Sequence, residues 1–192
     1  MLKPAILYKD ALPSCFAIAS MNPLNRFVQD TYWNFSDLVS DSQWNSLEFV
    51  SVDHSDNIIG ILRVTIDRGA HFVYAMMALR FEKDGAYDIA WAKDFKDFFV
   101  LLFGYYNFNK IDFEVCIGSP HEIMYDRFCA NYGGRIVGTK KKHFCLTDGT
   151  IHDIKMYEVS RYDFISAIGE EKWKKLSMSK VMLLTPKERG ES

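Results

Sequence analysis

Two carboxylates offer the clearest acid–base chemistry in this sequence. Asp112 and Glu114 lie two residues apart in the alternating stretch from Ile111 to Ile117, a pattern that predicts a β-strand with both side chains on one face. A carboxylate on a central strand is costly unless it is paired or hydrated, so the two are candidates for a general base. A salt bridge to Arg63 or Lys155 would explain them equally well.

A predicted helix with titratable side chains follows the strand. Ser119 and Pro120 are typical first residues of a helix, and Gly133 with Gly134 is a typical stop. Within this helix, Tyr125 is interpreted as a half-buried structural tyrosine with a hydrated hydroxyl. His121 in the first turn is a candidate proton donor, and a surface histidine is the competing interpretation.

The sequence gives no sign of metal or thiol chemistry. The four cysteines show no C-x-x-C spacing and are expected to be small buried side chains in a reducing compartment. If Cys15 were a nucleophile it would need a positioned histidine, and none of the five histidines forms a local signature with it. No metal-ligand spacing, phosphate-binding loop or hydrolase motif occurs.

Composition predicts a soluble globular protein. The chain has 192 residues, 48% apolar content and a net charge of −2, so it can bury a core and has no general attraction for nucleic acid or anionic lipid. The one basic run, Lys140 to Lys142, is interpreted as a solvated strand segment. Neither a signal peptide nor a membrane-length apolar stretch is present, so we expect no membrane association and a cytoplasmic location.

The elements that must position these residues are predicted from periodicity. Residues 1–46 form an N-terminal part with short helices at 27–32 and 36–44. Strands at 47–53, 58–67 and 72–81 form an antiparallel meander whose last member is apolar enough to be covered on both faces. We expect one domain over residues 1–192, with its core at 47–160 and a C-terminal extension at 161–192.

After the meander the period becomes helical. Apolar residues recur from Trp91 to Tyr106, and Lys93, Asp94, Lys96 and Asp97 are expected on the opposite face. A strand, a helix and a second strand imply a parallel pairing through a right-handed crossover. Residues 135–146 and 151–159 are predicted to form a hairpin around Asp148-Gly149, and a last helix is expected near residues 170–176.

This order of elements resembles the GNAT superfamily of N-acetyltransferases, in particular its RimJ/RimL-like branch. The resemblance is carried by Leu102 to Tyr105, Ile111 to Val115, Tyr132 to Gly138 and Gly149 to Tyr157, within residues 47–160. It implies an α/β fold with a mixed sheet, acetyl-CoA as co-substrate and a primary amine of a protein or small molecule as acceptor. Direct attack of the amine in a ternary complex is the implied mechanism.

The resemblance also implies where acetyl-CoA would bind. A backbone N–H of the strand near Met77 to Leu79 would polarise the thioester, and the loop after this strand would hold the pyrophosphate. Here that loop reads Glu82-x-x-Gly85-x-Tyr87, so only its middle glycine follows the family pattern. The residues expected to contact the cofactor are Met77, Ala78, Leu79, Arg80, Lys83, Gly85, Ala86, Tyr87 and Ser119.

Two functions remain open at this point. In the first, the chain is an acyltransferase in which Glu114, Asp112 or Glu82 is the base. The resemblance implies a tyrosine acid four residues before the glycine that ends the helix, but Cys129 or Ala130 stands there. Tyr125, one turn earlier, is the nearest substitute. In the second, the altered loop has lost cofactor binding, and the chain is an inactive module whose aromatic residues between 27 and 49 contact a protein partner.

Overall fold

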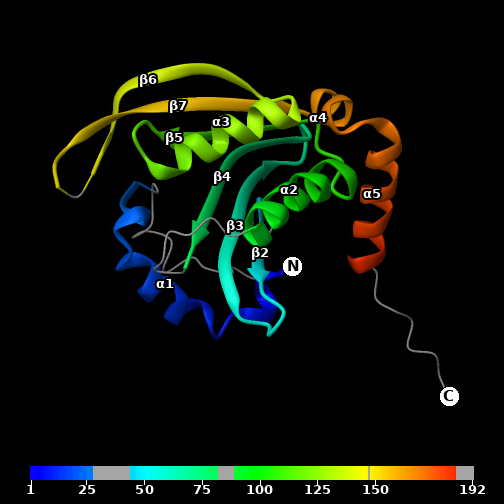
Figure 1. The fold of residues 1–192 in the computed structure, drawn as a ribbon, viewed down its shortest axis with the longest axis horizontal. Coiled ribbons are helices and arrows are strands. Elements are labelled where there is room, and N and C mark those ends of the chain that lie inside the picture. Colours follow the sequence, from blue (N-terminus) through cyan, green and yellow to red (C-terminus); the bar gives the residue numbers. More distant parts are fainter. Residues whose placement is uncertain (28–43, 82–88, 147, 185–192) are drawn as a thin grey trace.

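The computed structural model describes residues 1–27, 44–81, 89–146 and 148–184. Within these residues, seven strands form one twisted sheet with helices on both of its faces (Figure 1). In chain order the elements are β1 (Leu2–Pro4), the 3-10 helix η1 (Ala5–Tyr8), α1 (Leu12–Ser20), the 3-10 helix η2 (Pro23–Phe27), β2 (Ser46–Val52), β3 (Ile58–Asp67), β4 (Phe72–Arg80), α2 (Ile89–Gly104), β5 (Lys110–Cys116), α3 (Pro120–Tyr132), β6 (Arg135–Cys145), β7 (Ile151–Ser160), α4 (Arg161–Ile168) and α5 (Glu170–Leu184).

The sheet has the predicted mixture of antiparallel and parallel pairing. Its strand order is β1-β2-β3-β4-β5-β7-β6, with β2, β3 and β4 forming the antiparallel meander. Strands β4 and β5 are parallel and are connected through α2, as the crossover pattern predicts. The β6–β7 hairpin inserts β7 beside β5 and leaves β6 at the edge of the sheet.

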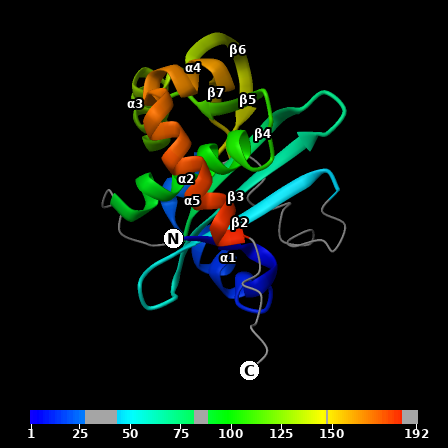
Figure 2. The same ribbon diagram turned by 90° about the vertical axis from the view of Figure 1, so that its right-hand side faces the viewer.

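The sheet is covered by a different apolar cluster on each face. Helices α2, α3, α4 and α5 lie on one face, where the larger cluster includes Phe98, Phe99 and Phe113. The N-terminal segment lies on the other face, where Phe16 of α1 packs against Phe81 with ring centroids 5.1 Å apart. Turned by 90°, the molecule shows α1 on the opposite side of β2 and β3 from α2 (Figure 2).

The N-terminal part differs from the prediction. Strand β1 and helix α1 were not expected, and the predicted helices at 27–32 and 36–44 lie almost entirely outside the described residues. Pro13 led to the prediction of a break, but it occupies the first turn of α1, where a missing backbone N–H costs nothing. Leu12, Phe16 and Ala19 are buried against the sheet, so packing on β2, β3 and β4 stabilises this helix.

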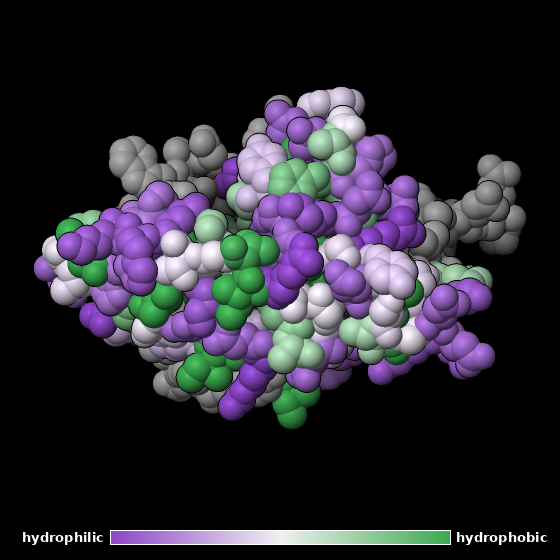
Figure 3. Space-filling view, turned by 90° about the horizontal axis from the view of Figure 1, so that it is seen from above, coloured by the Kyte–Doolittle hydropathy of each residue, from purple (hydrophilic) through white to green (hydrophobic). Residues whose placement is uncertain are grey.

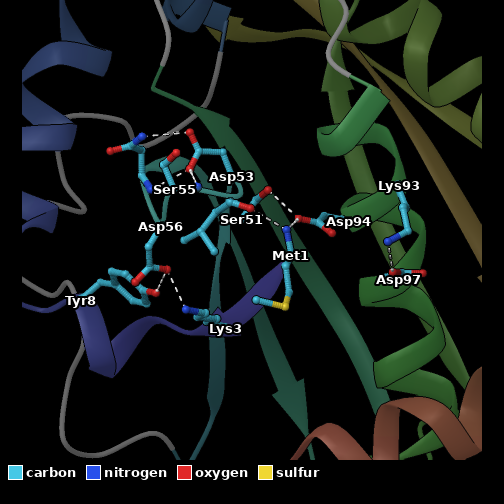
Figure 4. A network of polar contacts seen from close by, with 12 residues as sticks. Met1, Lys3, Tyr8, Ser51, Asp53, Ser55, Asp56, Lys93, Asp94 and Asp97 are labelled. Carbon is cyan, nitrogen blue, oxygen red and sulfur yellow. Dashed lines mark hydrogen bonds and ion pairs between the residues drawn. The ribbon is translucent and has the colours of Figure 1, made fainter.

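The predicted solvent-exposed face of α2 is wrong for its two aspartates. Asp94 and Asp97 are 2% and 3% exposed. Asp94 accepts a hydrogen bond from the Ser51 hydroxyl at 2.7 Å, and its Oδ2 lies 2.6 Å from the amino group of Met1 (Figure 4). The α2 helix is therefore covered on its charged side by the ends of β1 and β2, which sequence periodicity does not reveal.

The burial of the cysteines agrees only in part with the prediction. Cys116 and Cys129 are buried as predicted, whereas Cys145 on β6 is exposed and the prediction for it is wrong.

The face that carries β6 and β7 mixes hydrophilic and hydrophobic side chains (Figure 3), and Ile136 and Ile151 are among its exposed apolar residues. None of the helices in the described ranges is both long and apolar enough to cross a membrane.

Gly60 on β3 provides a test of this packing. A Cβ at this position would lie 2.4 Å from the carbonyl oxygen of Leu79 and 2.7 Å from Cζ3 of Trp91. Gly60→Ala should therefore lower the free energy of unfolding by about 1 to 3 kcal/mol, because strand β4 or helix α2 must shift. The matched control is Gly69→Ala, where the nearest atom is 3.4 Å away. Equal urea midpoints for the two variants would contradict this packing.

Candidate functional site

The central feature of the sheet is the point at which two parallel strands separate. Strands β4 and β5 are paired only at Phe72 with Lys110 and at Val73 with Ile111. Beyond this point β4 stays paired with β3 up to Arg80, and β5 stays paired with β7 up to Cys116. The two strands therefore diverge along the rest of their length.

A cleft of about 490 Å³ occupies the gap between these strands. Tyr74 and Ala75, at the start of the divergence, are exposed, so β4 is not covered on both faces as its composition predicted. The lining residues are Phe27, Arg63, Thr65, Tyr74, Ala75, Met76, Met77, Ala78, Asp112, Phe113, Glu114, Val115, Cys116, His121, Tyr125, Val137, Lys140, Ile154, Met156 and Tyr157.

The cleft joins the two faces of the sheet. Ile111, Phe113 and Val115 point into the core beneath α2 and α3, so the alternation along β5 places Asp112 and Glu114 on the opposite face. Both carboxylates line the cleft, and so does Tyr125 of α3. The structure therefore brings together all three predicted catalytic residues, with the carboxylates and the phenol contributed from opposite faces.

Glu114 is paired with a lysine that was not expected in the site. Its Oε2 accepts a hydrogen bond from Nζ of Lys140 at 2.6 Å. The predicted partners have other contacts, since Arg63 pairs with Glu48 and Lys155 lies between Glu122 and Asp126. The Lys140 side chain is 38% exposed, in keeping with the predicted solvated segment, but it also lines the cleft.

Asp112 has a carboxyl group with a raised pKa. Burial raises the pKa of its carboxyl group, and the nearby Glu158 raises it further, while Lys110 opposes both effects. Nζ of Lys110 lies 3.1 Å from Oδ2, whereas Oδ1 is buried and has no hydrogen-bond partner among the described residues. A carboxylate with a raised pKa and one open oxygen is suited to accept a proton.

Tyr125 is held rigidly by other aromatic rings. Its ring stacks on Phe95 with centroids 5.7 Å apart and meets the edge of Phe113 at 5.1 Å. Burial raises the pKa of the phenol, and Cys129 adds to the shift. The hydroxyl therefore stays protonated at neutral pH, which is the state that a general acid requires.

His121 is a site residue that the sequence ranked only as an alternative acid. It lines the cleft, and its Nε2 is buried without a hydrogen-bond partner in the described part of the chain. Burial lowers the pKa of the imidazole, and the charge of Arg80 lowers it further. The ring is thus neutral at physiological pH. Its place in the first turn of α3, where the helix dipole disfavours a cation, was the signal available in the sequence.

Only some of the residues predicted to contact a cofactor line the cleft. Met77 and Ala78 line the cleft, whereas the Leu79 side chain is fully buried in the cluster on the α1 side. Ser119 precedes α3 as predicted, but its buried Oγ makes no capping hydrogen bond and has no partner among the described residues. Arg80 is close enough to His121 for its charge to lower the pKa of that imidazole. Lys83, Gly85, Ala86, Tyr87 and the alternative base Glu82 lie outside the described residues.

The lining of the cleft is compatible with the acyl-CoA arm that the sequence resemblance implies. Its walls combine apolar side chains, such as Met76, Met156 and Ile154, with the backbone of β4. A pantetheine arm is a narrow chain of methylenes and amides, and such walls can hold its apolar parts and pair with its amides. Within the described residues, no group of three or more His, Cys, Asp or Glu side chains could hold a metal ion.

Comparison with solved structures finds N-acetyltransferases. The spermidine N-acetyltransferase from Vibrio cholerae, in complex with CoA and spermine, matches with a TM-score of 0.68 and 16% identity over 86% of this chain and 97% of that chain. A chimera of the Vibrio cholerae enzyme and hSSAT matches with a TM-score of 0.62 and 16% identity over 86% and 99%. No protein-family model and no curated sequence matches. This likeness shows the fold, and it confirms the predicted GNAT-like α/β class.

The lowered pKa of His121 predicts a pH dependence of stability. Since the folded-state pKa lies below 6.5, the unfolded chain binds more protons as the pH falls through this value, and folding stability declines. His121→Gln removes that loss, so its free energy of unfolding should improve relative to the wild type between about pH 7.5 and about pH 5. The exposed His143 gives the control His143→Gln, which should follow the wild type. Parallel urea titrations at each pH measure both, and identical profiles for all three proteins would contradict the burial of His121.

Proposed function

We propose that this chain is a CoA-dependent N-acyltransferase that acts on an amine. The observation that supports the proposal most is the cleft between β4 and β5, because it is lined by carboxylates and by a protonated tyrosine. The fold is that of N-acetyltransferases, and the neighbour from Vibrio cholerae holds CoA and a polyamine. The finer placement in the RimJ/RimL-like branch remains a prediction.

The residues of the cleft divide the work of acyl transfer. A bound acyl-CoA supplies the thioester. The carboxylate pair Asp112 and Glu114 takes the proton from the acceptor ammonium, and the Tyr125 hydroxyl returns a proton to the departing sulfur. The backbone of β4 near Met77 provides hydrogen bonds that hold the acyl oxygen. His121, as a neutral imidazole, can pass a proton without carrying charge into the cleft.

The acceptor is expected to approach from the face that carries the carboxylates. Asp112 and Glu114 lie on this face together with Arg63 and Lys140, so the entrance has both signs of charge. An amine acceptor suits the two carboxylates, and a cationic amine of the kind bound by the Vibrio cholerae neighbour is the first class to test.

Binding of acetyl-CoA tests the proposal directly. Millimolar acetyl-CoA should raise the melting temperature, since a ligand present at about 100 times its Kd stabilises a protein by about 2.7 kcal/mol. Ala75→Phe, which places a ring in the cleft entrance, should remove the shift. Ala70→Phe is the matched control, because Ala70 lies in the exposed turn before β4. If neither a melting shift nor heat of binding appears at millimolar acetyl-CoA, the binding-module alternative replaces the enzyme.

Tyr125→Phe tests the acid. Loss of the hydroxyl should lower kcat by about 100-fold, the lower range for a general acid, while the Kd for acetyl-CoA stays within about twofold. The measurement is thiol release at saturating amine, and the exposed Tyr162 supplies the control Tyr162→Phe. An unchanged kcat would show that Tyr125 only packs the core.

A further inference from the structure

Lys140 places a primary amine of the protein inside the cleft. It belongs to β6, where its Cα is paired with Ile154 of β7. From there its side chain reaches the Glu114 carboxylate, with Nζ and Oε2 2.6 Å apart. Both residues line the same cleft. Among the described residues that line this cleft, Lys140 is the only lysine.

The position of Lys140 meets both requirements for an acyl acceptor. An amine that attacks a thioester must lie in the cleft and must have a base within hydrogen-bond reach to take its proton. Glu114, one of the candidate bases, is already in contact with Nζ of Lys140. By contrast, Lys155 pairs with Asp126 at 3.1 Å and is not part of the cleft lining.

The local backbone separates Lys140 from the two lysines that follow it. The pairing of β6 with β7 is irregular between Lys140 and Phe144, and Lys142 has a φ of +48°. Asp153 holds this bulge, since its carboxylate accepts hydrogen bonds from the Lys142 backbone N–H at 2.8 Å and from Lys141 Nζ at 2.7 Å. The Lys141 side chain is 77% exposed, against 38% for Lys140. Asp153 therefore holds Lys141 outside, while Lys140 enters the cleft.

We propose that Lys140 is a self-acylation site, at which the chain transfers an acyl group from acyl-CoA to its own Nζ. This inference depends on the proposed function. Glu114 takes one proton from the ammonium, Nζ forms an amide bond with the acyl carbon, and the carbon–sulfur bond breaks. The nitrogen loses a second proton as the amide forms, and the departing sulfur gains one, so CoA leaves as its free thiol. Glu114 then releases its proton to solvent and is again a carboxylate. Ammonium and thioester thus become amide, thiol and one proton, so no further reactant is needed.

Acylation would change the charge of the site. An acylated Lys140 carries no charge and cannot form the ion pair with Glu114. The carboxylate would then be open to the ammonium group of an external acceptor. Self-acylation would thus change the entrance from a neutral pair to an anionic group, which favours cationic amines.

The experiment measures how fast each of three adjacent lysines is acetylated. The full chain is incubated with deuterated acetyl-CoA, and mass spectrometry compares the rates at Lys140, Lys141 and Lys142. Chemical acylation favours the exposed Lys141, whereas self-acylation should label Lys140 at least about tenfold faster, because a positioned base assists it. The rate per molecule should not change on dilution of the protein, since the reaction is intramolecular.

Two variants and one parallel assay complete the test. Glu114→Gln should slow labelling of Lys140 by about tenfold or more and leave Lys141 and Lys142 unchanged. Lys140→Arg should remove the fast label. If added amines are acylated while Lys140 is labelled no faster than Lys141, the inference is wrong and the proposed function stands. If acetyl-CoA neither binds nor labels any lysine, both are wrong.

Discussion

The separation of β4 from β5 is the constraint on which the rest of the molecule depends. Two parallel strands that share only two paired positions cannot hold a sheet together by themselves. Strand β4 is held instead by its antiparallel ladder with β3, and β5 by seven paired positions with β7. The aromatic rings of α2 and α3, among them Phe99 and Phe128, pack beneath the gap with centroids 4.5 Å apart. A gap at the centre of a sheet is thus kept open without loss of the core.

Most of the strand and helix order could be predicted because it depends on local patterns. The alternation in residues 58–67 reproduces β3, and the serine, proline and glycine signals around α3 give both of its ends. The errors occur where distant segments determine burial. Asp94 and Asp97 follow the polar period of α2, yet both are buried, and Asp94 contacts Ser51 of β2 and the amino group of Met1. Helix α1 has a weak pattern and is stabilised by packing on the sheet.

In the candidate site, too, the local arrangement could be predicted from the sequence, whereas the contacts between distant segments could not. The two carboxylates of β5 could be placed together because a strand has a period of two. The partner of Glu114 could not, because Lys140 and Glu114 are on strands that do not touch. Strand β7 lies between them, and Lys140 pairs with Ile154 while Glu114 pairs with Met156. The contact is a diagonal across three strands, and only the register of the hairpin, including its irregularities, determines it.

Charge pairing in the cleft also affects how the proposed amine acceptor would enter. Each carboxylate near the entrance faces a cation, with Asp112 beside Lys110 and Glu114 beside Lys140, so the cleft as a whole offers little net attraction to a cationic acceptor. To pair with Glu114, an incoming ammonium would have to displace Lys140, whose side chain is 38% exposed and can be rehydrated when it leaves. The exchange of one ammonium for another costs little in electrostatic energy, in contrast to the burial of an unpaired charge. For the proposed amine acceptor, selectivity would therefore depend on contacts beyond the charge. Asp112 Oδ1 and His121 Nε2 are buried atoms of the cleft-lining residues that have no partner among the described residues, and an acceptor could supply one.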